Sequence, residues 1–340
     1  MSRSTPPSVP SDDIETWLAG LGRPVAEVQP LPGDVSPRRY TRVVFAEKGG
    51  TAEASAILAT YPPEARATCP RFLRTSELLT GAGVPVPRIL AADCDNGFML
   101  VEDLGAETLA DWKGRSWSVL SLYFERALRL GERIARLPVE SVADLNPRLG
   151  GELLRRELAQ TWDLFLAPRG LTGDSAFTEA LRGALDTLCE RLGSGPLAPC
   201  HRDFMSRNLM PVDDQGSLAV LDHQDLRLGP AFYDLASLLN DTLFPPPGIE
   251  EELLADALPN LQAPPGETAR TGYHRAAAQR TLKAVGTYTS FSLRGADRHL
   301  PLIGPTLSRC LGHLARIPEG EALAEDLGRL WRPVLDAVDR

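Results

Sequence analysis

The chain has 340 residues, of which 24% are charged and 43% are hydrophobic, proportions that suit a globular protein with a core large enough for two lobes. Its net charge of −9 at pH 7 makes nucleic acid or an anionic membrane surface an unfavourable partner. No apolar run is long enough to span a bilayer, and the first residues contain no apolar signal segment. We therefore expect a cytoplasmic protein, and the sequence indicates no obligate protein partner.

Five cysteines are scattered along the chain, and their spacings match neither a metal site nor a CxxC motif. They are Cys69, Cys94, Cys189, Cys200 and Cys310. In a reducing cytoplasm we expect all of them to remain thiols.

The first hundred residues alternate between strand-like and helix-like patterns. Runs rich in β-branched and aromatic residues stand on either side of EKGG and predict a hairpin, which follows a loop rich in glycine, proline and serine. The expected elements are a disordered leader (1–11), a short helix (12–22), the hairpin (40–61), a helix (71–83) and two strands (84–93 and 97–105). Residues 12–104 are therefore predicted to form a small N-terminal lobe.

From Leu109 onward, apolar residues recur at three- and four-residue spacing, which indicates a mainly helical C-terminal lobe over residues 105–340. One interruption, NLMPVDDQGSLAVLD, has the pattern of a hairpin with its turn at residues 213–216. The proline-rich segments 244–248 and 262–267 are expected to be loops within this lobe. The predicted fold class is α+β, with a small β-rich lobe and a larger helical lobe.

The segment HRDFMSRN, at residues 201–208, is similar to the catalytic loop of a protein kinase. Phosphoryl transfer from ATP requires an oriented acceptor hydroxyl and metal ions on the phosphates. Asp203 is the candidate base, and the amide oxygen of Asn208 can bind Mg2+. Asp222 follows the hairpin that returns the chain beside this loop, so it is the candidate carboxylate ligand.

Together, HRDFMSRN, LDHQD (221–225) and LGPAFYDLASLLND (228–241) resemble the aminoglycoside phosphotransferase family, whose fold is protein-kinase-like and two-lobed. Further segments, among them SPRRYTRV (36–43) and AAQRTLKAVGTYTSFSLR (277–294), are most similar to bacterial kinases that phosphorylate N-acetylmuramate and N-acetylglucosamine at the anomeric hydroxyl. The resemblance extends over nearly the whole chain. It implies an ATP-dependent phosphotransferase that uses Mg2+ and a small sugar acceptor with an alcohol group. By the same resemblance, the N-terminal lobe (12–104) binds the nucleotide and the C-terminal lobe (105–340) carries the catalytic and acceptor-binding residues.

Two residues depart from the pattern of these kinases. Met205 stands where a histidine is expected, on the acceptor side of the loop. His223 replaces a phenylalanine beside the predicted metal ligand, and we expect it to serve packing rather than to contact a phosphate. The resemblance further implies that Asp234 braces the catalytic loop. For Asp225 two roles are open, bracing Arg202 or supporting the metal site, where it is a weaker ligand candidate than Asp222.

The phosphate-binding lysine that kinases usually carry on their third strand is missing, since SAILATYPPEA contains no lysine. The preceding segment supplies Ser36, Arg38, Arg39 and Arg42, and guanidinium groups bind phosphate well. We expect Arg38 or Arg39 to provide the cation, and Glu77 on the following helix to orient it.

The segment LVEDLG is expected to link the two lobes. By the same resemblance, adenine would be held there by the backbone between Glu102 and Leu104, whose side chains need not touch it.

The acceptor is expected between the catalytic loop and the C-terminal helices. An aromatic face suits a pyranose ring, a carboxylate suits sugar hydroxyls, and a cation could meet the lactyl carboxylate of N-acetylmuramate. The candidates are Glu157, Trp162, Met205, Arg207, Gln279 and Arg280, with Lys283 close to the last two. For Trp162 the alternative is simple packing in the core.

Three functions are consistent with these residues. The first is a kinase acting on the anomeric hydroxyl of an amino sugar in peptidoglycan recycling, and the second is a kinase of the same fold for another sugar or an aminoglycoside. The third, a pseudokinase that binds nucleotide without catalysis, is favoured by the missing lysine alone, whereas Asp203, Asn208 and Asp222 argue against it.

Overall fold

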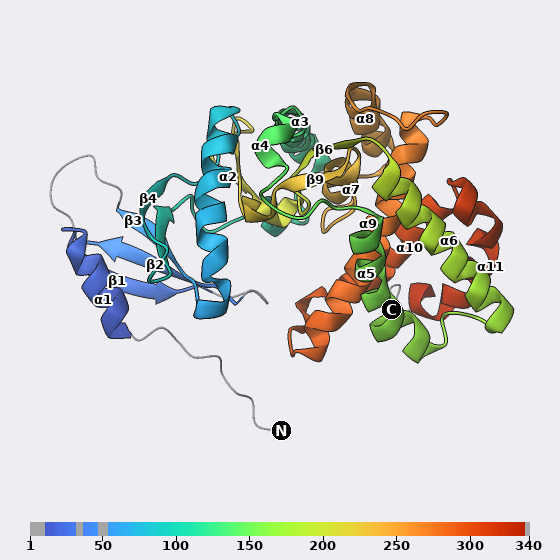
Figure 1. Cartoon of the computed structure of the whole chain (residues 1–340), viewed down its shortest axis with the longest axis horizontal. Coiled ribbons are helices and arrows are strands. Elements are labelled where there is room, and N and C mark those ends of the chain that lie inside the picture. The colour runs from blue at the N-terminus through green and yellow to red at the C-terminus, as the bar shows by residue number, and fades with distance from the viewer. Residues whose placement is uncertain (1–10, 32–36, 47–53, 337–340) are drawn as a thin grey trace. The chain divides into compact units, whose positions relative to one another are not determined.

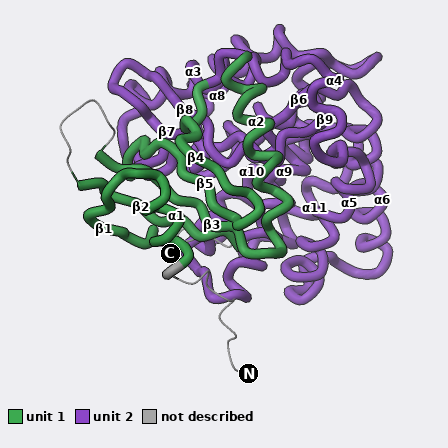
Figure 2. Tube along the Cα trace, turned by 60° about the vertical axis from the view of Figure 1, so that its left-hand side comes forward, with its two compact units in different colours: residues 1–81, 85–106 green, residues 82–84, 107–340 purple. Residues whose placement is uncertain are grey.

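The computed structural model describes residues 11–31, 37–46 and 54–336. The chain forms two compact units: residues 1–81 with 85–106, and residues 82–84 with 107–340 (Figure 2). Most of the predicted leader and the candidate residue Ser36 lie outside the described residues. The described helices include none that is both long and apolar enough to cross a membrane.

The first unit is built on a five-stranded antiparallel sheet with the strand order β1-β2-β3-β5-β4 (Figure 1). Its elements are α1 (Ser11–Gly20), β1 (Val25–Pro30), β2 (Arg39–Phe45), β3 (Ser55–Thr60), α2 (Cys69–Gly81), β4 (Ile89–Asp93) and β5 (Phe98–Glu102). The predicted hairpin is β2–β3, and the predicted helices and the two later strands are present. Strand β1 was not predicted, because all six of its residues are exposed and no buried face produces an alternating pattern.

The two faces of this sheet are covered by different helices. Leu18 of α1 joins a buried cluster with Leu58 and Leu100, whereas Phe72 of α2 packs with Met99 in a second cluster. Successive side chains of a strand point to opposite faces, so Met99 of β5 packs on the side of α2 and Leu100 packs on the side of α1. Helices α1 and α2 therefore lie on opposite faces of the sheet.

The prediction that all five cysteines remain thiols is wrong for two of them. Cys69, the first residue of α2, forms a disulfide with Cys94, the residue that follows β4. Their separation of 25 residues has no motif to reveal it, and only the fold brings the two side chains together. The remaining three cysteines are buried thiols.

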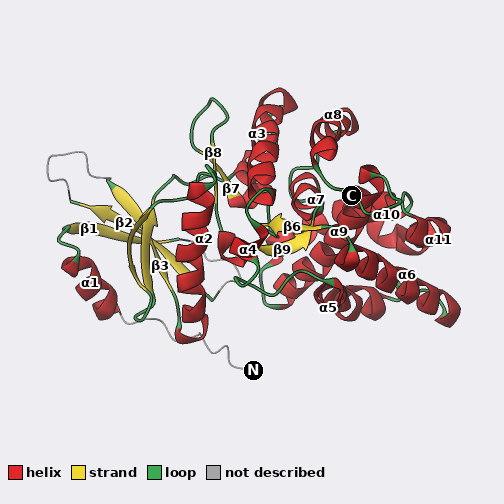
Figure 3. Cartoon of the chain, turned by 45° about the horizontal axis from the view of Figure 1, so that its top comes forward, coloured by secondary structure: helices red, strands yellow, loops and turns green. Residues whose placement is uncertain are grey.

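The second unit is mainly helical, with two short antiparallel strand pairs, β6–β9 and β7–β8 (Figure 3). Its helices are α3 (Trp117–Ala135), α4 (Val139–Val142), α5 (Gly151–Thr161), α6 (Ser175–Ser194), α7 (Tyr233–Leu239), α8 (Pro247–Ala257), α9 (Ala269–Leu293), α10 (Ile303–Leu314) and α11 (Pro318–Leu335). Its strands are β6 (Leu197–Cys200), β7 (Leu209–Pro211), β8 (Leu218–Val220) and β9 (Arg227–Pro230). The hairpin predicted around residues 213–216 is β7–β8.

Helix α9 lies at the centre of the second unit and is buried over most of its length. Its N-terminus is capped by Thr268, whose side chain accepts a hydrogen bond from the backbone N–H of Thr271. A Cβ atom at Gly286 would lie 2.3 Å from Oγ1 of Thr161, so glycine is required for α5 and α9 to approach this closely. Thr161 donates to the carbonyl of Leu282 at 2.8 Å, which fixes the register of the two helices.

Candidate functional site

The catalytic loop at residues 201–208 connects β6 to β7 and is braced by Asp234 at the start of α7. The two oxygens of the Asp234 carboxylate accept hydrogen bonds from the backbone N–H groups of His201 at 2.7 Å and Arg202 at 2.9 Å. Arg202 has a φ of 76°, a left-handed conformation that is costly for a residue other than glycine, and these bonds hold it there. The predicted bracing role of Asp234 is confirmed.

Asp203 follows this strained residue and projects a carboxylate that is 25% exposed. Its Oδ1 atom accepts hydrogen bonds from Nη2 of Arg280 at 3.3 Å and from Nζ of Lys283 at 3.5 Å, both on α9. Burial opposes ionisation of this carboxyl, but the charges of Lys283, Arg202 and Arg280 outweigh burial and hold the pKa of Asp203 well below its usual range. The group is therefore a carboxylate at any physiological pH, suited to accept a hydrogen bond from a hydroxyl.

A network of charged and polar side chains surrounds Arg202. Its Nη2 donates to Glu157 at 2.7 Å and its Nη1 to Asp225 at 3.0 Å, which confirms the predicted partnership of Asp225 with Arg202. Burial opposes ionisation of Glu157 as well, yet Lys283 and Arg202 lower its pKa. The hydroxyl of Tyr233 donates to Gln279 at 3.1 Å in the same network. Glu157 and Gln279, both predicted to contact the acceptor, thus belong to the network around Arg202, the residue before Asp203.

The β7–β8 hairpin brings the predicted metal ligands together. Leu209 is paired with Val220, and the backbone N–H of Leu221 donates to the carbonyl of Asn208 at 2.8 Å, so Asp222 stands one residue beyond the end of the ladder. Asp222 has a φ of 56°, a left-handed conformation that aspartate tolerates better than most residues.

The side chains of these two residues are oriented by local hydrogen bonds. Nδ2 of Asn208 donates to the backbone carbonyl of Asp203 at 2.8 Å, which leaves the amide oxygen as the end available to a cation. Nε2 of Gln224 donates to Asp222 at 3.1 Å. One amide oxygen and one carboxylate are hard oxygen donors of the kind that Mg2+ binds together with phosphate oxygens and water, so these residues fit the ion. The described residues contain no group of three or more His, Cys, Asp or Glu that could hold a metal by itself.

Two residues that depart from the family pattern are buried. His223 is fully buried beside Asp222, which supports the packing role expected for it. Met205 is 6% exposed, and its sulfur accepts a hydrogen bond from Nη2 of Arg280 at 3.7 Å. Met205 therefore supports the guanidinium that contacts Asp203.

Arg207, predicted to contact the acceptor, is held inside the second unit. Its Nη2 donates to Asp241 at 2.6 Å and to the hydroxyl of Tyr288 at 3.3 Å. Asp241 also accepts a hydrogen bond from Ser206, so the end of the catalytic loop is anchored to the segment after α7. This arrangement gives Arg207 a structural role.

Trp162 is 8% exposed, and the guanidinium of Arg182 lies 3.9 Å from the centre of its ring. This packing favours the alternative considered for Trp162, a core residue whose ring face is already covered. Gln279 is also fully buried, so in this structure its amide supports Glu157 and Tyr233.

The arginines predicted to bind phosphate occupy different environments within the first unit. Arg38 is 9% exposed, with its guanidinium 5.8 Å from the ring centre of Tyr40 and 6.0 Å from that of Tyr61. Arg39 is exposed at the start of β2. Arg42, on β2 beside that segment, forms an ion pair with Asp103 at 2.6 Å, so its guanidinium already has a carboxylate partner within the first unit.

The remaining nucleotide-side residues also lie in the first unit. Glu77 is 72% exposed and lies 3.8 Å from Arg74 on its own helix, so its predicted pairing with Arg38 or Arg39 stays a prediction. The backbone N–H of Glu102 donates to the carbonyl of Arg88 at 2.8 Å, and that donor is not free for adenine. The carbonyl of Glu102 and the backbone of Leu104 remain the predicted contacts.

Lys283, predicted near the acceptor together with Gln279 and Arg280, lies beside Asp203 in the structure. The chain has only three lysines, and this one stands three residues after Arg280. Residues at this spacing share a helix face, so its position beside Asp203 follows from the helix once Arg280 is placed there.

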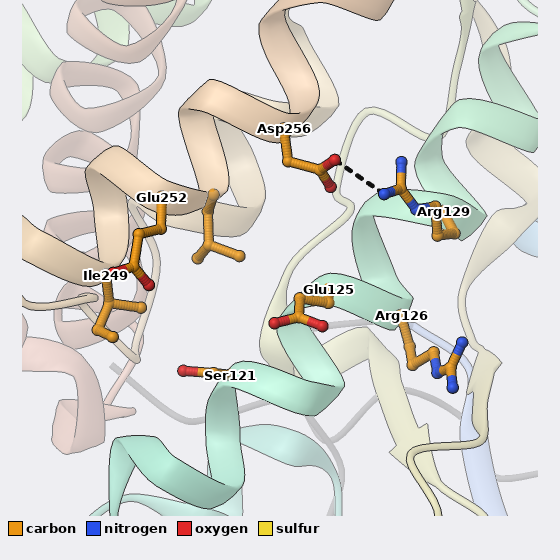
Figure 4. Close-up of a pocket in the computed structure, with 8 residues that line it drawn as sticks. Ser121, Glu125, Arg126, Arg129, Ile249, Glu252 and Asp256 are labelled. Atoms are coloured by element: carbon orange, nitrogen blue, oxygen red, sulfur yellow. Dashed lines mark hydrogen bonds and ion pairs between the residues drawn. The ribbon is translucent and has the colours of Figure 1, made fainter.

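A separate surface cavity of about 360 Å³ lies between α3 and α8 (Figure 4). Ser121, Glu125 and Arg129 face it from α3, and Glu252 and Asp256 face it from α8, with Arg129 donating to Asp256 at 2.8 Å. Its lining does not include the catalytic loop, so this cavity is not the site described above.

Comparison with known proteins identifies a family and several similar kinases. The pattern of the phosphotransferase enzyme family matches residues 27–281. An N-acetylmuramate/N-acetylglucosamine kinase from Pseudomonas aeruginosa is 33% identical over 90% of this chain and 89% of its own length. A protein of the same name from Pseudomonas putida is 30% identical over 89% of each chain.

The fold is that of solved phosphotransferases. An aminoglycoside phosphotransferase from Streptomyces rimosus, in complex with ADP and streptomycin, has a TM-score of 0.53 at 15% identity, covering 81% of this chain and 99% of its own. The predicted protein-kinase-like fold, with an antiparallel sheet in one unit and a helical second unit, is confirmed. Because the family pattern spans most of the chain and encloses the catalytic loop and both predicted metal ligands, this protein is a member of the phosphotransferase enzyme family.

Proposed function

We propose that this phosphotransferase transfers the γ-phosphoryl group of ATP to the anomeric hydroxyl of an N-acetylated amino sugar, N-acetylmuramate or N-acetylglucosamine or both. The observation that carries the proposal is the partly exposed carboxylate of Asp203, held by Arg280 and Lys283 in a loop that Asp234 braces. The names of the two Pseudomonas relatives support the choice of acceptor.

The properties of Asp203 suit an anomeric hydroxyl. A carboxylate whose pKa is held low is a weak base, so it orients a hydroxyl and accepts its proton late, as the bond to phosphorus forms. The anomeric hydroxyl is the most acidic hydroxyl of a sugar, and it is therefore the one that gives up its proton most readily to a weak base.

The proposed contacts with the donor are those predicted from the sequence. Asn208 and Asp222 would hold Mg2+, which supplies neutralisation of the charge on the phosphates when it is bound. Ser36 with Arg38 or Arg39 would bind the phosphates, Glu77 would orient the arginine, and the backbone from Glu102 to Leu104 would hold the base.

The acceptor is a component of the bacterial cell wall, so the reaction would return wall sugars to metabolism as sugar phosphates. Peptidoglycan recycling in the cytoplasm is the role that fits this chemistry, because ATP is the donor and the acceptor is a free sugar.

The test is an ADP-release assay with ATP and Mg2+ on a panel of acceptors: N-acetylmuramate, N-acetylglucosamine, glucosamine, glucose and kanamycin. Phosphorus NMR of the product identifies the phosphorylated oxygen. The expected result is an anomeric phosphate on an N-acetylated sugar, absent with Asp203→Asn. Turnover with kanamycin or glucose alone would reject the acceptor and retain the phosphotransferase.

A further inference from the structure

Two cations from α9 contact the same oxygen of the candidate catalytic base. Nη2 of Arg280 and Nζ of Lys283 both donate to Oδ1 of Asp203, at 3.3 and 3.5 Å. Arg280 and Lys283 are three residues apart on the helix, so they extend from one face. These two cations lie side by side next to Asp203, and we refer to them as the α9 cation pair.

The two members of the α9 cation pair differ in how well they are held. Arg280 has further partners, since its Nε donates to Ser237 at 3.0 Å and its Nη2 also contacts the sulfur of Met205. For the ammonium of Lys283, Asp203 at 3.5 Å is the one hydrogen-bond partner among the residues that the structure describes. An ammonium has three protons to donate, so Lys283 retains capacity for a ligand.

The ion-pair network around Asp203 contains more cations than carboxylates. Four cations meet three carboxylates through the ion pairs Arg202–Glu157, Arg202–Asp225, Arg227–Asp225, Arg280–Asp203 and Lys283–Asp203. Asp234 lies nearby and adds a negative charge, but its oxygens accept hydrogen bonds from the backbone N–H groups of the loop and form no ion pair with the α9 cation pair. The two members of the α9 cation pair share a single carboxylate, Asp203, so an anionic ligand would complete their partners.

That anion has two sources in a phosphotransferase, the transferred phosphoryl group and the acceptor. The candidate ligands for the phosphoryl-bound metal, Asn208 and Asp222, belong to the β7–β8 hairpin, whereas Lys283 belongs to α9. Nζ of Lys283 lies 3.5 Å from Oδ1 of Asp203, and both side chains are partly exposed, at 11% and 25%. An acceptor whose hydroxyl meets the Asp203 carboxylate would therefore come within reach of the ammonium.

We propose that Lys283 is a specificity-determining residue whose ammonium binds a carboxylate on the acceptor. The inference rests on the proposed function and refines it: the enzyme distinguishes N-acetylmuramate from N-acetylglucosamine through Lys283. The two sugars share the ring, the anomeric hydroxyl and the acetamido group, and they differ in the lactyl ether with its carboxylate. Only the acidic sugar can form a charge-assisted hydrogen bond with the ammonium.

The experiment compares kcat/KM for the two sugars in four proteins: native, Lys283→Met, Lys283→Arg and the control Arg270→Met. Arg270 is a cation on the same helix that pairs with Glu251 near the helix start and is 45% exposed. Loss of one charge-assisted hydrogen bond corresponds to about a tenfold or larger change in affinity. We expect Lys283→Met to lower kcat/KM for N-acetylmuramate by about tenfold more than for N-acetylglucosamine.

The ratio of the two kcat/KM values isolates the proposed contact from other effects. Lys283→Arg, which keeps the charge, should retain much of the preference for the acidic sugar, and Arg270→Met should leave the ratio unchanged. An equal fall for both sugars in Lys283→Met would overturn the inference, because it would show that the ammonium serves the phosphoryl group or the fold. Thermal unfolding of each variant identifies a loss of fold.

Different measurements test the proposed function and the role of Lys283. If the native enzyme phosphorylates neither sugar, the proposed function is wrong and the inference falls with it. If the native enzyme phosphorylates both sugars with similar kcat/KM values and Lys283→Met leaves their ratio unchanged, the function stands and the specificity role of Lys283 is rejected.

Discussion

Arg42 on β2 and Asp103, the residue that follows β5, are joined by two hydrogen bonds. Nε and Nη2 of Arg42 donate to the two carboxylate oxygens of Asp103 at 2.6 and 3.0 Å. Ser55 donates to the same carboxylate at 2.7 Å, and the Asp103 side chain is only 6% exposed. The pair therefore uses an arginine of the predicted phosphate-binding segment to stabilise the sheet of the first unit.

Replacing Arg42 by alanine should lower the free energy of unfolding of the protein by about 2 kcal/mol, because a largely buried carboxylate is left without its cation. Urea unfolding followed by circular dichroism measures the change. The matched control is Arg74→Ala, since Arg74 is 57% exposed and its pair with Glu77 should contribute no more than about 0.5 kcal/mol. Equal effects of the two substitutions would contradict the structural role of Arg42.

Asp203→Asn should reduce kcat by about a thousandfold, since the amide cannot accept the hydroxyl proton while the loop and its braces remain. The dissociation constant of ATP should change little, as measured by isothermal calorimetry. Asp214→Asn, in the exposed β7–β8 turn, is the control and should leave kcat unaltered. Near-native turnover by Asp203→Asn would remove it from the role of base.

Asp222→Ala should raise the Mg2+ concentration required for half-maximal activity by about tenfold or more, because one of the two protein ligands is lost. Removal of the metal with EDTA should abolish turnover by the native enzyme, and added Mg2+ should restore it. A variant with an unchanged Mg2+ titration would show that Asp222 does not bind the metal.

The pKa of Asp234 makes stability depend on pH. Burial raises the pKa of this carboxyl from 3.8 to about 6, despite the nearby imidazole of His201 and the hydrogen bonds from the loop. The folded protein then binds the proton more tightly than the unfolded chain, so Asp234 contributes stability at pH values near 4 that is lost as the pH rises to about 6.

A shift of about 2 units corresponds to about 2 to 3 kcal/mol. Urea unfolding at pH 4.5, 5.5 and 7 should therefore show a steeper loss of stability with rising pH in the native protein than in Asp234→Asn. Parallel pH profiles for the two proteins would exclude a raised pKa for Asp234.

The Cys69–Cys94 disulfide closes a loop of 25 residues between α2 and β4. A cross-link of this kind typically contributes about 2 to 4 kcal/mol to stability. Dithiothreitol should therefore lower the unfolding temperature of the native protein, and the double variant Cys69→Ser, Cys94→Ser should be insensitive to it. An unfolding temperature independent of the reductant, with free thiols detected at both positions, would show that the bridge does not form.

The catalytic loop was predictable because its residues are close in sequence and their roles depend on local spacing. Asp203 and Asn208 lie five residues apart, and the turn at residues 213–216 showed that the chain returns with Asp222. Helix α3 and strand β2 were predictable for a similar reason, since one more buried side leaves a period of 3.6 or 2 in the sequence.

Other features depend on contacts between residues far apart in the chain. Strand β1 has no buried side and so no period, and the disulfide joins cysteines that no motif relates. Arg42 and Arg38 belong to one short segment with similar chemistry, yet Asp103, 61 residues later, holds Arg42 in the sheet. Spacing alone cannot distinguish such neighbours.

The sequence by itself indicated the family, the candidate base and the candidate metal ligands, because their motifs depend on short-range spacing. The tertiary structure decided which cations meet Asp203. Arg207 pairs with Asp241, while Arg280 and Lys283 reach the carboxylate from α9, about 80 residues away along the chain. Charge partners in a buried site are set by which helix faces the loop, and only packing of the whole unit fixes that face.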